Sequence, residues 1–271
     1  TRKESSAASD VYKRQDESGV IPKEKFINAI NSDTILVSVM AVNNETGIIQ
    51  PIKLVSNIIS KSGSPALFHC DAVQAFGKVN LKPQKLGVDL MSISSHKIHG
   101  PKGVGALYIR KGARIVPLHY GGEQERKIRP GTESLPLICA FAEAVKALPN
   151  IDDQHEKIEE LWNYCKEKVL EIPNVYINSP DGVLPYILNI SAVGVRSETM
   201  LHYLAESGIY VSSGSACAKG KKSHVLTAMG LSPERIDSAI RISFSKFNTK
   251  DDIDIFAEKL AEGMKNLAKS R

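Results

Sequence analysis

Residues 90–109 constrain the fold of this 271-residue chain more than any other stretch. They read LMSISSHKIHGPKGVGALYI, in which an apolar run lies on either side of a short segment rich in Gly, Pro, His and Lys. Apolar runs bounded by turn residues are typical of strands, so we predict a hairpin-like unit with Lys97 at its tip. His96 and Lys102 lie close to Lys97 in the sequence, and cationic neighbours favour an amine that loses its proton and attacks a carbonyl.

A second apolar run, residues 66–70, ends at Asp71. Lys97 follows Asp71 by 26 residues, which is enough for a crossover between parallel strands, so both side chains are expected at the carboxyl edge of one sheet. Pyridoxal phosphate requires this pair, because its aldehyde reacts with a lysine amine and its ring nitrogen stays protonated beside a carboxylate. Taken singly, Lys97 could be a surface lysine in a turn and Asp71 a cap at a strand end.

The first half of the chain alternates expected strands and helices. Residues 34–42 form a continuous apolar, β-branched run that predicts a buried parallel strand, and a helix is expected from about residue 51 to Gly63. Further strands are expected at 89–94 and 104–110. This order predicts a doubly wound α/β domain whose site lies at the carboxyl ends of its strands.

The second half predicts a smaller α+β domain. From Asp152, apolar residues at three- and four-residue steps indicate a long helix with Trp162 in the core. Further strands are expected at 186–191, 209–212 and 239–244, and further helices at 134–148, 197–206, 223–229 and after Thr249. We therefore expect domains at 16–150 and 151–271, and we expect residues 1–15 to be disordered or a non-native extension.

Composition excludes several classes of protein. Hydrophobic residues make up 42% and charged residues 24% of the chain, as in ordinary soluble proteins. The net charge of +5 comes without an arginine-rich run, so a nucleic acid partner has no support. No apolar stretch approaches the ~18 residues of a membrane span, and no signal peptide opens the chain. The cysteines lack metal-ligand spacing, so we expect thiols in a cytoplasmic setting, with Cys70, Cys139 and Cys165 packed in apolar surroundings.

Five ordered motifs make the chain similar to the cysteine desulfurases. These NifS- and IscS-like enzymes depend on pyridoxal phosphate and belong to the class-V aminotransferases. The motifs are NNETG (43–47), HCDAVQ (69–74), SHKIHGPKG (95–103), RPGTE (129–133) and SSGSAC (212–217). The resemblance runs from about residue 16 to the C-terminus. It implies the aspartate-aminotransferase fold, with a mixed, mostly parallel sheet in a large domain and a smaller C-terminal α+β domain.

The resemblance also implies how the cofactor is held. Lys97 binds it covalently and later moves the proton on the substrate Cα, and Asp71 pairs with its ring nitrogen. The other contacts go to the phenolic oxygen or the phosphate: Asn44 and Gln74 to the oxygen, Ser94 and His96 to the phosphate, and Thr132 to the phosphate of the neighbouring subunit in a homodimer. From the residues alone, Asn43 and Asn44 could instead form a turn.

Cys217 lies among glycines and small residues, with lysines and hydroxyls nearby that favour its thiolate. By the resemblance, its thiol takes the sulfur of L-cysteine as a persulfide, L-alanine is released, and the sulfur passes to an acceptor or iron-sulfur scaffold protein. Arg241 matches the residue that binds the substrate carboxylate, together with Asn44. From the residues alone, Arg241 could be a strand arginine in a surface ion pair.

Two other functions are compatible with these motifs. The chain could be a same-fold aminotransferase or selenocysteine lyase, although transamination needs no thiol such as that of Cys217. It could also be an inactive, truncated scaffold protein. The family's glycine- and hydroxyl-rich phosphate loop and its ring-stacking histidine have no counterpart in the chain. We therefore expect an N-terminally incomplete chain that binds the cofactor weakly on its own.

Overall fold

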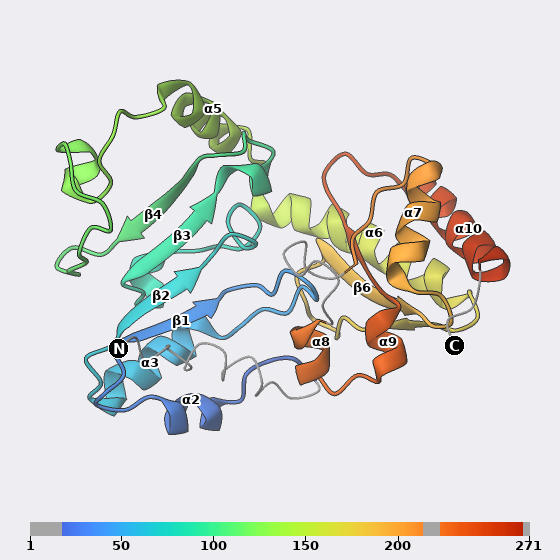
Figure 1. The fold of residues 1–271 in the computed structure, drawn as a ribbon, viewed down its shortest axis with the longest axis horizontal. Helices are drawn as coiled ribbons and strands as arrows, with labels where there is room; N and C mark the ends of the chain where they lie inside the picture. The colour runs from blue at the N-terminus through green and yellow to red at the C-terminus, as the bar shows by residue number, and fades with distance from the viewer. Residues whose placement is uncertain (1–17, 214–222, 268–271) are drawn as a thin grey trace. The chain divides into compact units, whose positions relative to one another are not determined.

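The computed structural model describes residues 18–213 and 223–267, which divide into two compact units (Figure 1). Unit 1 comprises Thr1–Phe26, Val42–Gln50 and Asp152–Arg271, and unit 2 comprises Ile27–Ala41 and Pro51–Ile151. One boundary between the units lies near residue 151. The segment Val42–Gln50, which we expected in the first domain, belongs to the same unit as the C-terminal residues.

Unit 2 contains a four-stranded sheet. In spatial and sequence order its strands are β1 (Leu36–Met40), β2 (Leu67–Asp71), β3 (Leu90–Ser94) and β4 (Gly105–Ile109). The first three are parallel and β4 runs antiparallel to β3, so the mixed, mostly parallel sheet is confirmed. A doubly wound sheet requires a reversal of strand order, and the described strands follow one another without one. That part of the prediction is wrong for the described sheet.

Helices α3 (Ile52–Ser62) and α4 (Pro83–Leu86) and the 3-10 helix η1 (Ser95–Ile98) connect these strands. Helix α2 (Lys23–Ala29) precedes β1 and belongs partly to each unit, and the 3-10 helix η2 (Gln124–Lys127) and helix α5 (Leu135–Lys146) follow β4. Helix α3 contacts β2 and ends, as predicted, at Gly63, whose φ of 69° is left-handed.

The two faces of this sheet differ in polarity. One face carries buried apolar side chains, namely Val39, Phe68, Cys70 and Met91. The other is mixed: it carries the polar side chains Ser38, His69, Asp71, Ser92 and Ser94 together with Leu36, Met40, Leu67 and Leu90. Strand β1 is parallel to β2, as predicted, but it lies at the edge and is only partly buried: Val39 is 5% exposed, whereas Leu36 is 51% and Ile35, just before the strand, 80% exposed.

Unit 1 contains a three-stranded antiparallel sheet. Its strands are β5 (Val175–Ile177), β6 (Ile187–Ala192) and β7 (Ala239–Ser243), with β6 in the centre and buried throughout. Residues 209–212 contribute one isolated bridge, between Ser212 and Arg241, instead of the predicted strand. Strand β5 was not predicted.

Helices α6 (Ile151–Leu170), α7 (Ser197–Glu206), α8 (His224–Ala228), α9 (Pro233–Asp237) and α10 (Lys250–Asn266) complete unit 1. Trp162 of α6 is 6% exposed and donates its indole N–H to the Ile187 carbonyl at 3.0 Å, which confirms its place in the core. Thr249 and Asp252 form the capping box that starts α10, as the sequence predicts for Thr249.

The segment Val42–Gln50 is a tight loop built into unit 1. The Asn43 side-chain oxygen accepts hydrogen bonds from the N–H groups of Glu45 (2.9 Å) and Thr46 (3.0 Å), so Asn43 is a turn residue. Gly47 has a φ of 80°, and a Cβ there would lie 2.9 Å from the Leu184 carbonyl oxygen. A larger residue would therefore separate the loop from residues 184–189.

Candidate active site

Two predicted site residues, Asp71 and Ser94, close neighbouring parallel strands of unit 2. Asp71 is paired in register with Ser92, and Ser94 lies two residues further along β3 on the same face. The Asp71 carboxylate accepts a hydrogen bond from the Val73 N–H at 2.9 Å, which fixes its orientation. Gln74, in the same turn, is 8% exposed.

Lys97 lies in η1, which joins β3 to the antiparallel strand β4. The predicted hairpin-like unit is therefore confirmed. The Lys97 side chain is half-buried. On the same turn, the Ser94 hydroxyl lies 2.7 Å from Nδ1 of His96, so these two side chains form a hydrogen-bonded pair beside Lys97.

Basic side chains lie near Lys97 in the described structure. Burial lowers the pKa of His96, and the charges of Lys97 and Lys102 lower it further. Lys78, a residue that the sequence reasoning missed, has its pKa lowered to about 8, chiefly by burial and also by the charge of Lys97. Its sequence signal was its position seven residues after Asp71, in the turn that follows β2.

A polar ladder crosses the three parallel strands on the face of Asp71. The imidazole of His69 lies 2.8 Å from the Ser38 hydroxyl through Nδ1 and 3.2 Å from the Ser92 hydroxyl through Nε2. Burial lowers the pKa of His69, and the nearby Asp71 carboxylate acts in the opposite direction. These contacts form a polar strip across this face of the sheet.

Thr132 is exposed and follows η2. Gln124 orients this segment by accepting a hydrogen bond from the Gly131 N–H at 3.2 Å. Within η2, Glu125, Arg126 and Lys127 all have positive φ (46°, 57° and 64°), a conformation that strains residues other than glycine. The segment that leads to Thr132 therefore has a distinctive backbone.

Two further predicted residues, Asn44 and Arg241, contact each other in unit 1. The Arg241 guanidinium donates from Nη1 to the Asn44 carbonyl at 3.0 Å. The Arg241 backbone pairs in both directions with Ser212, at 2.7 and 3.2 Å. Burial lowers the pKa of Arg241, and the negative charge of Glu45 opposes that shift. Among the described residues, buried Nε of Arg241 has no hydrogen-bond partner.

Glu45 is a second residue that the sequence reasoning missed. It is 1% exposed, and its carboxylate accepts a hydrogen bond from the Ser223 hydroxyl at 2.6 Å. Ser223 also caps α8 by accepting a hydrogen bond from the Leu226 N–H. Because Glu45 and Ser223 are 178 residues apart, no local pattern could have connected them.

The predicted nucleophile Cys217 lies outside the described residues. Of the other cysteines, Cys70 and Cys165 are buried, and burial raises the pKa of each thiol to about 12, which makes both unreactive. Cys139 is exposed, so the prediction that it packs in apolar surroundings is wrong. Its helix, α5, buries Phe141 but leaves most of its surface in solvent.

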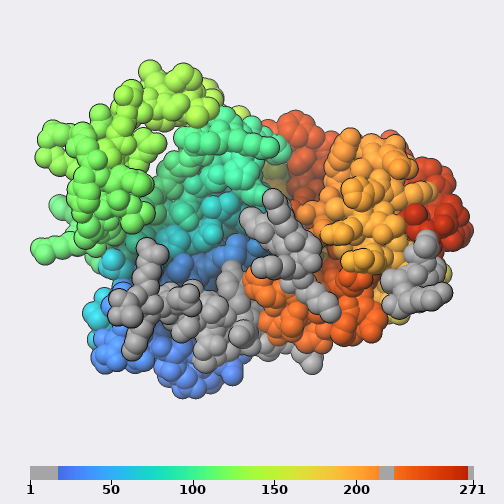
Figure 2. Space-filling view, in the orientation of Figure 1, coloured from blue at the N-terminus to red at the C-terminus, as the bar shows by residue number. Residues whose placement is uncertain are grey.

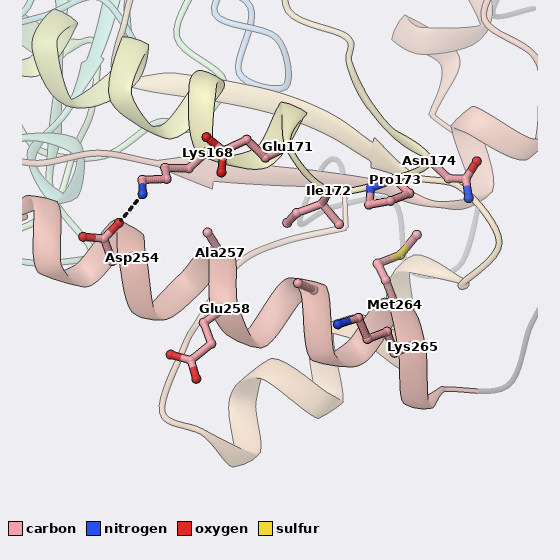
Figure 3. A pocket seen from close by; sticks show the side chains of 11 residues that line it. Lys168, Glu171, Ile172, Pro173, Asn174, Asp254, Ala257, Glu258, Met264 and Lys265 are labelled. Carbon is pink, nitrogen blue, oxygen red and sulfur yellow. Dashed lines mark ion pairs between the residues drawn. The ribbon is translucent and has the colours of Figure 1, made fainter.

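A cavity of about 480 Å³ lies in unit 1 between α6, α10 and the loop before β5 (Figure 3). Its lining combines apolar and charged side chains: Lys168, Glu171, Ile172, Pro173, Asn174, Asp254, Ala257, Glu258, Ala261, Met264 and Lys265. Lys168 and Asp254 form an ion pair across it at 3.4 Å. No predicted site residue lines this cavity, so it is not part of the predicted active site.

Helices in the described ranges are too short or too polar to cross a membrane. Within the same ranges, no group of three or more His, Cys, Asp or Glu side chains is placed to hold a metal ion.

Comparison with known proteins identifies relatives over most of the chain. The family described as Aminotransferase class-V matches residues 5–256, which begins upstream of residue 16, where we expected the resemblance to start. A protein of Methanosarcina thermophila named "Cysteine desulfurase IscS" is 41% identical over 260 residues. That match covers 94% of this chain and 64% of the relative, so the chain spans slightly less than two thirds of its relative's length.

Solved structures show the same similarity. A structure titled "NIFS-LIKE PROTEIN" is 39% identical with a TM-score of 0.87, covering 94% of this chain and 67% of that one. A structure titled "SspA in complex with cysteine" is 32% identical with a TM-score of 0.72, covering 87% of this chain and 66% of that one. Both likenesses extend over the two units described above. The chain therefore belongs to the class-V aminotransferase family.

Proposed function

We propose that this chain acts as a pyridoxal-phosphate-dependent cysteine desulfurase, which converts L-cysteine to L-alanine and leaves the sulfur as a persulfide on Cys217. One observation carries the proposal: Lys97 directly follows a strand that ends beside the strand of Asp71, on the sheet face that carries the polar strip. The printed names of the relatives, among them a cysteine desulfurase and a protein in complex with cysteine, support it.

The side chains of unit 2 fit the proposed cofactor. An amine at Lys97 suits its aldehyde, and the carboxylate of Asp71, oriented by Val73, suits its ring nitrogen. The hydrogen-bonded pair of Ser94 and His96 offers donors to a phosphate. When bound, the cofactor supplies an electron sink for charge that develops on the substrate carbon.

Each remaining residue has a proposed task. Lys97 would also move the proton on the substrate Cα. Gln74 and Asn44 would bind the phenolic oxygen of the cofactor, and Thr132 would serve the phosphate site of a second copy. In unit 1, Arg241 and Asn44 would bind the substrate, with the guanidinium of Arg241 on its carboxylate.

The sulfur transfer balances without an external oxidant. The Cys217 thiolate attacks the sulfur of the substrate, a sulfur–sulfur bond forms, and the carbon–sulfur bond breaks. The bonding electrons return to the carbon, which takes up a proton and becomes the methyl group of alanine. The persulfide would then pass its outer sulfur to an acceptor or iron-sulfur scaffold protein.

A homodimer is supported by exposed apolar side chains in unit 2. Val116, Leu118 and Tyr120 are 78%, 91% and 82% exposed, and Leu135 of α5 is 65% exposed. All of them lie within residues 116–135, as does Thr132, and Figure 2 draws this part of the chain in green. Exposed apolar groups of this size mark interaction surfaces, and a second copy that needs Thr132 is the occupant we propose. The free thiols of Cys70, Cys139 and Cys165 support a reducing compartment such as the cytoplasm.

The test is to incubate the purified protein and pyridoxal phosphate with L-cysteine and to measure alanine and protein-bound persulfide together. We expect equal amounts of both in the first turnover, with the persulfide mapped to Cys217. Alanine formed without a persulfide on Cys217 would contradict the mechanism. Parallel reactions with selenocysteine and with amino acid and keto acid pairs distinguish a selenocysteine lyase and an aminotransferase.

A further inference from the structure

Two serines of unit 1 lie on either side of the segment that contains Cys217. Residues 214–222 are outside the described ranges, with Ser212 shortly before them and Ser223 directly after them. The Arg241 N–H donates to the Ser212 carbonyl at 2.7 Å, and the Ser212 N–H donates to the Arg241 carbonyl at 3.2 Å. The chain therefore leads into the Cys217 segment from a position fixed beside the predicted substrate arginine.

On the other side, Ser223 is bound by a buried carboxylate. Its hydroxyl donates to Oε2 of Glu45 at 2.6 Å, and the same oxygen accepts a hydrogen bond from the Leu226 N–H at 3.1 Å. One hydroxyl therefore joins the first turn of α8 to a loop 178 residues earlier in the chain. Because both bonds use one oxygen atom, the position of Ser223 depends on Glu45 as well as on the helix.

The burial of Glu45 requires compensation. This residue is 1% exposed, and removing a carboxylate from water costs several kcal/mol unless hydrogen bonds and opposite charge offset it. Ser223 supplies the hydrogen bond, and the charge of Arg241 interacts with that of Glu45. An apolar side chain would fill the same space without the cost, so the carboxylate is explained by the groups that it binds.

These contacts form one connected series. The Arg241 backbone pairs with Ser212, and its guanidinium reaches the carbonyl of Asn44 at 3.0 Å. The next residue along the chain is Glu45, whose carboxylate binds Ser223. The proposed site for the substrate carboxylate and the residues on both sides of the Cys217 segment therefore share one framework. Such a framework affects rate, because a misplacement of about 1 Å between reacting groups can slow a reaction about 10²-fold.

We propose that Glu45 is a positioning residue that, through the Ser223 hydroxyl, fixes the C-terminal end of the Cys217 segment relative to the substrate site at Arg241. The inference rests on the proposed function, since it takes Cys217 as the nucleophile and Arg241 as the carboxylate site. Glu45 acts on the sulfur transfer through Ser223, and no contact with the substrate is required.

The first experiment separates substrate binding from sulfur transfer in the protein loaded with pyridoxal phosphate. The variants are Ser223→Ala, which removes the hydroxyl, Ser223→Thr, which keeps it, Glu45→Ala, and the double variant of Glu45→Ala with Ser223→Ala. For each, we measure the single-turnover rate of persulfide formation on Cys217 at saturating L-cysteine. The Kd of L-alanine, read from the cofactor absorbance, reports on Arg241 alone, because L-alanine carries the carboxylate but no sulfur.

We expect Ser223→Ala to lower the persulfide rate about tenfold, with the Kd of L-alanine unchanged within about twofold, and Ser223→Thr to restore the rate. The double variant should be no slower than the slower single variant, because both changes remove the same interaction. An unchanged rate in folded Ser223→Ala, or losses that multiply in the double variant, would overturn the proposal.

Thr249→Ala is the matched control for the loss of a helix cap. Thr249 caps α10 in the same unit, in a capping box with Asp252, so this variant loses a hydroxyl cap as Ser223→Ala does. Its persulfide rate should equal that of the unaltered protein. An equal loss of rate in Thr249→Ala and Ser223→Ala would reduce the role of Ser223 to general stability and refute the inference. Circular dichroism checks that each variant is folded.

A second experiment needs neither cofactor nor turnover. Hydrogen exchange of the Leu226 N–H is measured in the cofactor-free protein. In Glu45→Ala this N–H keeps its acceptor, but Ser223 loses the carboxylate that orients it. Exchange should therefore become roughly fivefold faster, the effect of losing one hydrogen bond, whereas Thr249→Ala should leave it unchanged. Equal exchange in Glu45→Ala and the unaltered protein would contradict the proposed fixation.

The same measurements distinguish this inference from the proposed function. Absence of a persulfide on Cys217 in the unaltered protein would overturn the proposed function. A persulfide that forms equally fast in the unaltered protein and in Ser223→Ala, with the Leu226 exchange unaffected by Glu45→Ala, would overturn only the role of Glu45.

Discussion

A buried carboxylate ties each unit together, but the two carboxylates differ in how far along the chain their partners lie. In unit 2, Asp89 is 8% exposed and accepts hydrogen bonds from the Phe68 N–H at 2.8 Å and the Arg110 guanidinium at 2.6 Å, each 21 residues away. In unit 1, Glu45 binds the Ser223 hydroxyl across 178 residues. The buried carboxylate of unit 2 therefore binds groups that are near it in the sequence, whereas the buried carboxylate of unit 1 binds a group far along the chain.

The difference explains which functional residues a sequence can reveal. Asp71 closes β2 and Lys97 lies in the turn that follows β3, so the strand pattern alone predicts that they lie near each other. Glu45 and Arg241 belong to the unit whose contacts span most of the chain, and their relation depends on the completed fold. We therefore test whether the residues that attach the cofactor belong to unit 2 and the residue that binds the substrate carboxylate to unit 1.

The largest expected effect is complete loss of cofactor attachment in Lys97→Ala. The β3–β4 connection also contains Lys102, so Lys102→Ala is the matched control and should retain attachment. Reduction with borohydride followed by peptide mapping measures both. Recovery of the pyridoxyl group on Lys102 would move the reactive lysine within unit 2 and refute the assignment.

Cys217→Ala should eliminate the persulfide while cofactor binding, measured by visible absorbance, stays intact, because the thiol acts only at the sulfur. Cys139→Ala removes an exposed thiol from α5 and should leave the persulfide yield unchanged. A normal yield in Cys217→Ala would show that the sulfur is carried elsewhere.

Arg241→Ala should weaken substrate capture by about 2–5 kcal/mol, the cost of removing one partner of a desolvated charge pair. The effect should be found in kcat/KM for L-cysteine, with cofactor attachment at Lys97 unchanged. Arg196→Ala is the control, because Arg196 is an exposed arginine of the same unit. A loss of cofactor attachment in Arg241→Ala would break the division of roles between the units.

The smallest effects concern stability, and they test the comparison of the two carboxylates directly. Glu45→Ala removes the acceptor of the Ser223 hydroxyl proton and the negative charge that acts on Arg241, and should destabilise unit 1 by about 1–3 kcal/mol. Trp162, the one tryptophan of the chain, reports on this unit by its fluorescence during urea unfolding. Glu143→Ala breaks an exposed pair and should change stability by less than about 0.5 kcal/mol.

Asp89→Ala provides the counterpart in unit 2. Hydrogen exchange of the β2 and β3 amides should accelerate, because the Phe68 N–H loses its acceptor. The Trp162 transition should shift less than in Glu45→Ala. Equal shifts in both variants would mean that the two units unfold as one cooperative body.

Local signals predicted much of the fold. The capping residue Thr249, the apolar spacing around Trp162 and the left-handed Gly63 each depend on residues within one or two helical turns. The exposure of Cys139 could not be predicted, because α5 is amphipathic in sequence but buries only Phe141 among its described side chains. Lys78 was missed because its burial and its proximity to the charge of Lys97 arise only in the completed fold.

The loop Val42–Gln50 also bears on the order in which the protein folds. It bonds to residues 133, 144, 178 and 197 positions further along the chain, through Ser179, Asn189, Ser223 and Arg241. During synthesis, the ribosome releases this loop long before its partners exist, so Glu45 stays exposed to water while the residues of unit 2 are still being added to the chain. Contacts of such separation slow folding. Assembly of unit 1 should therefore be the late step. Arg241 lies in β7, the last strand of the described chain, so it can reach the loop only near the end of synthesis.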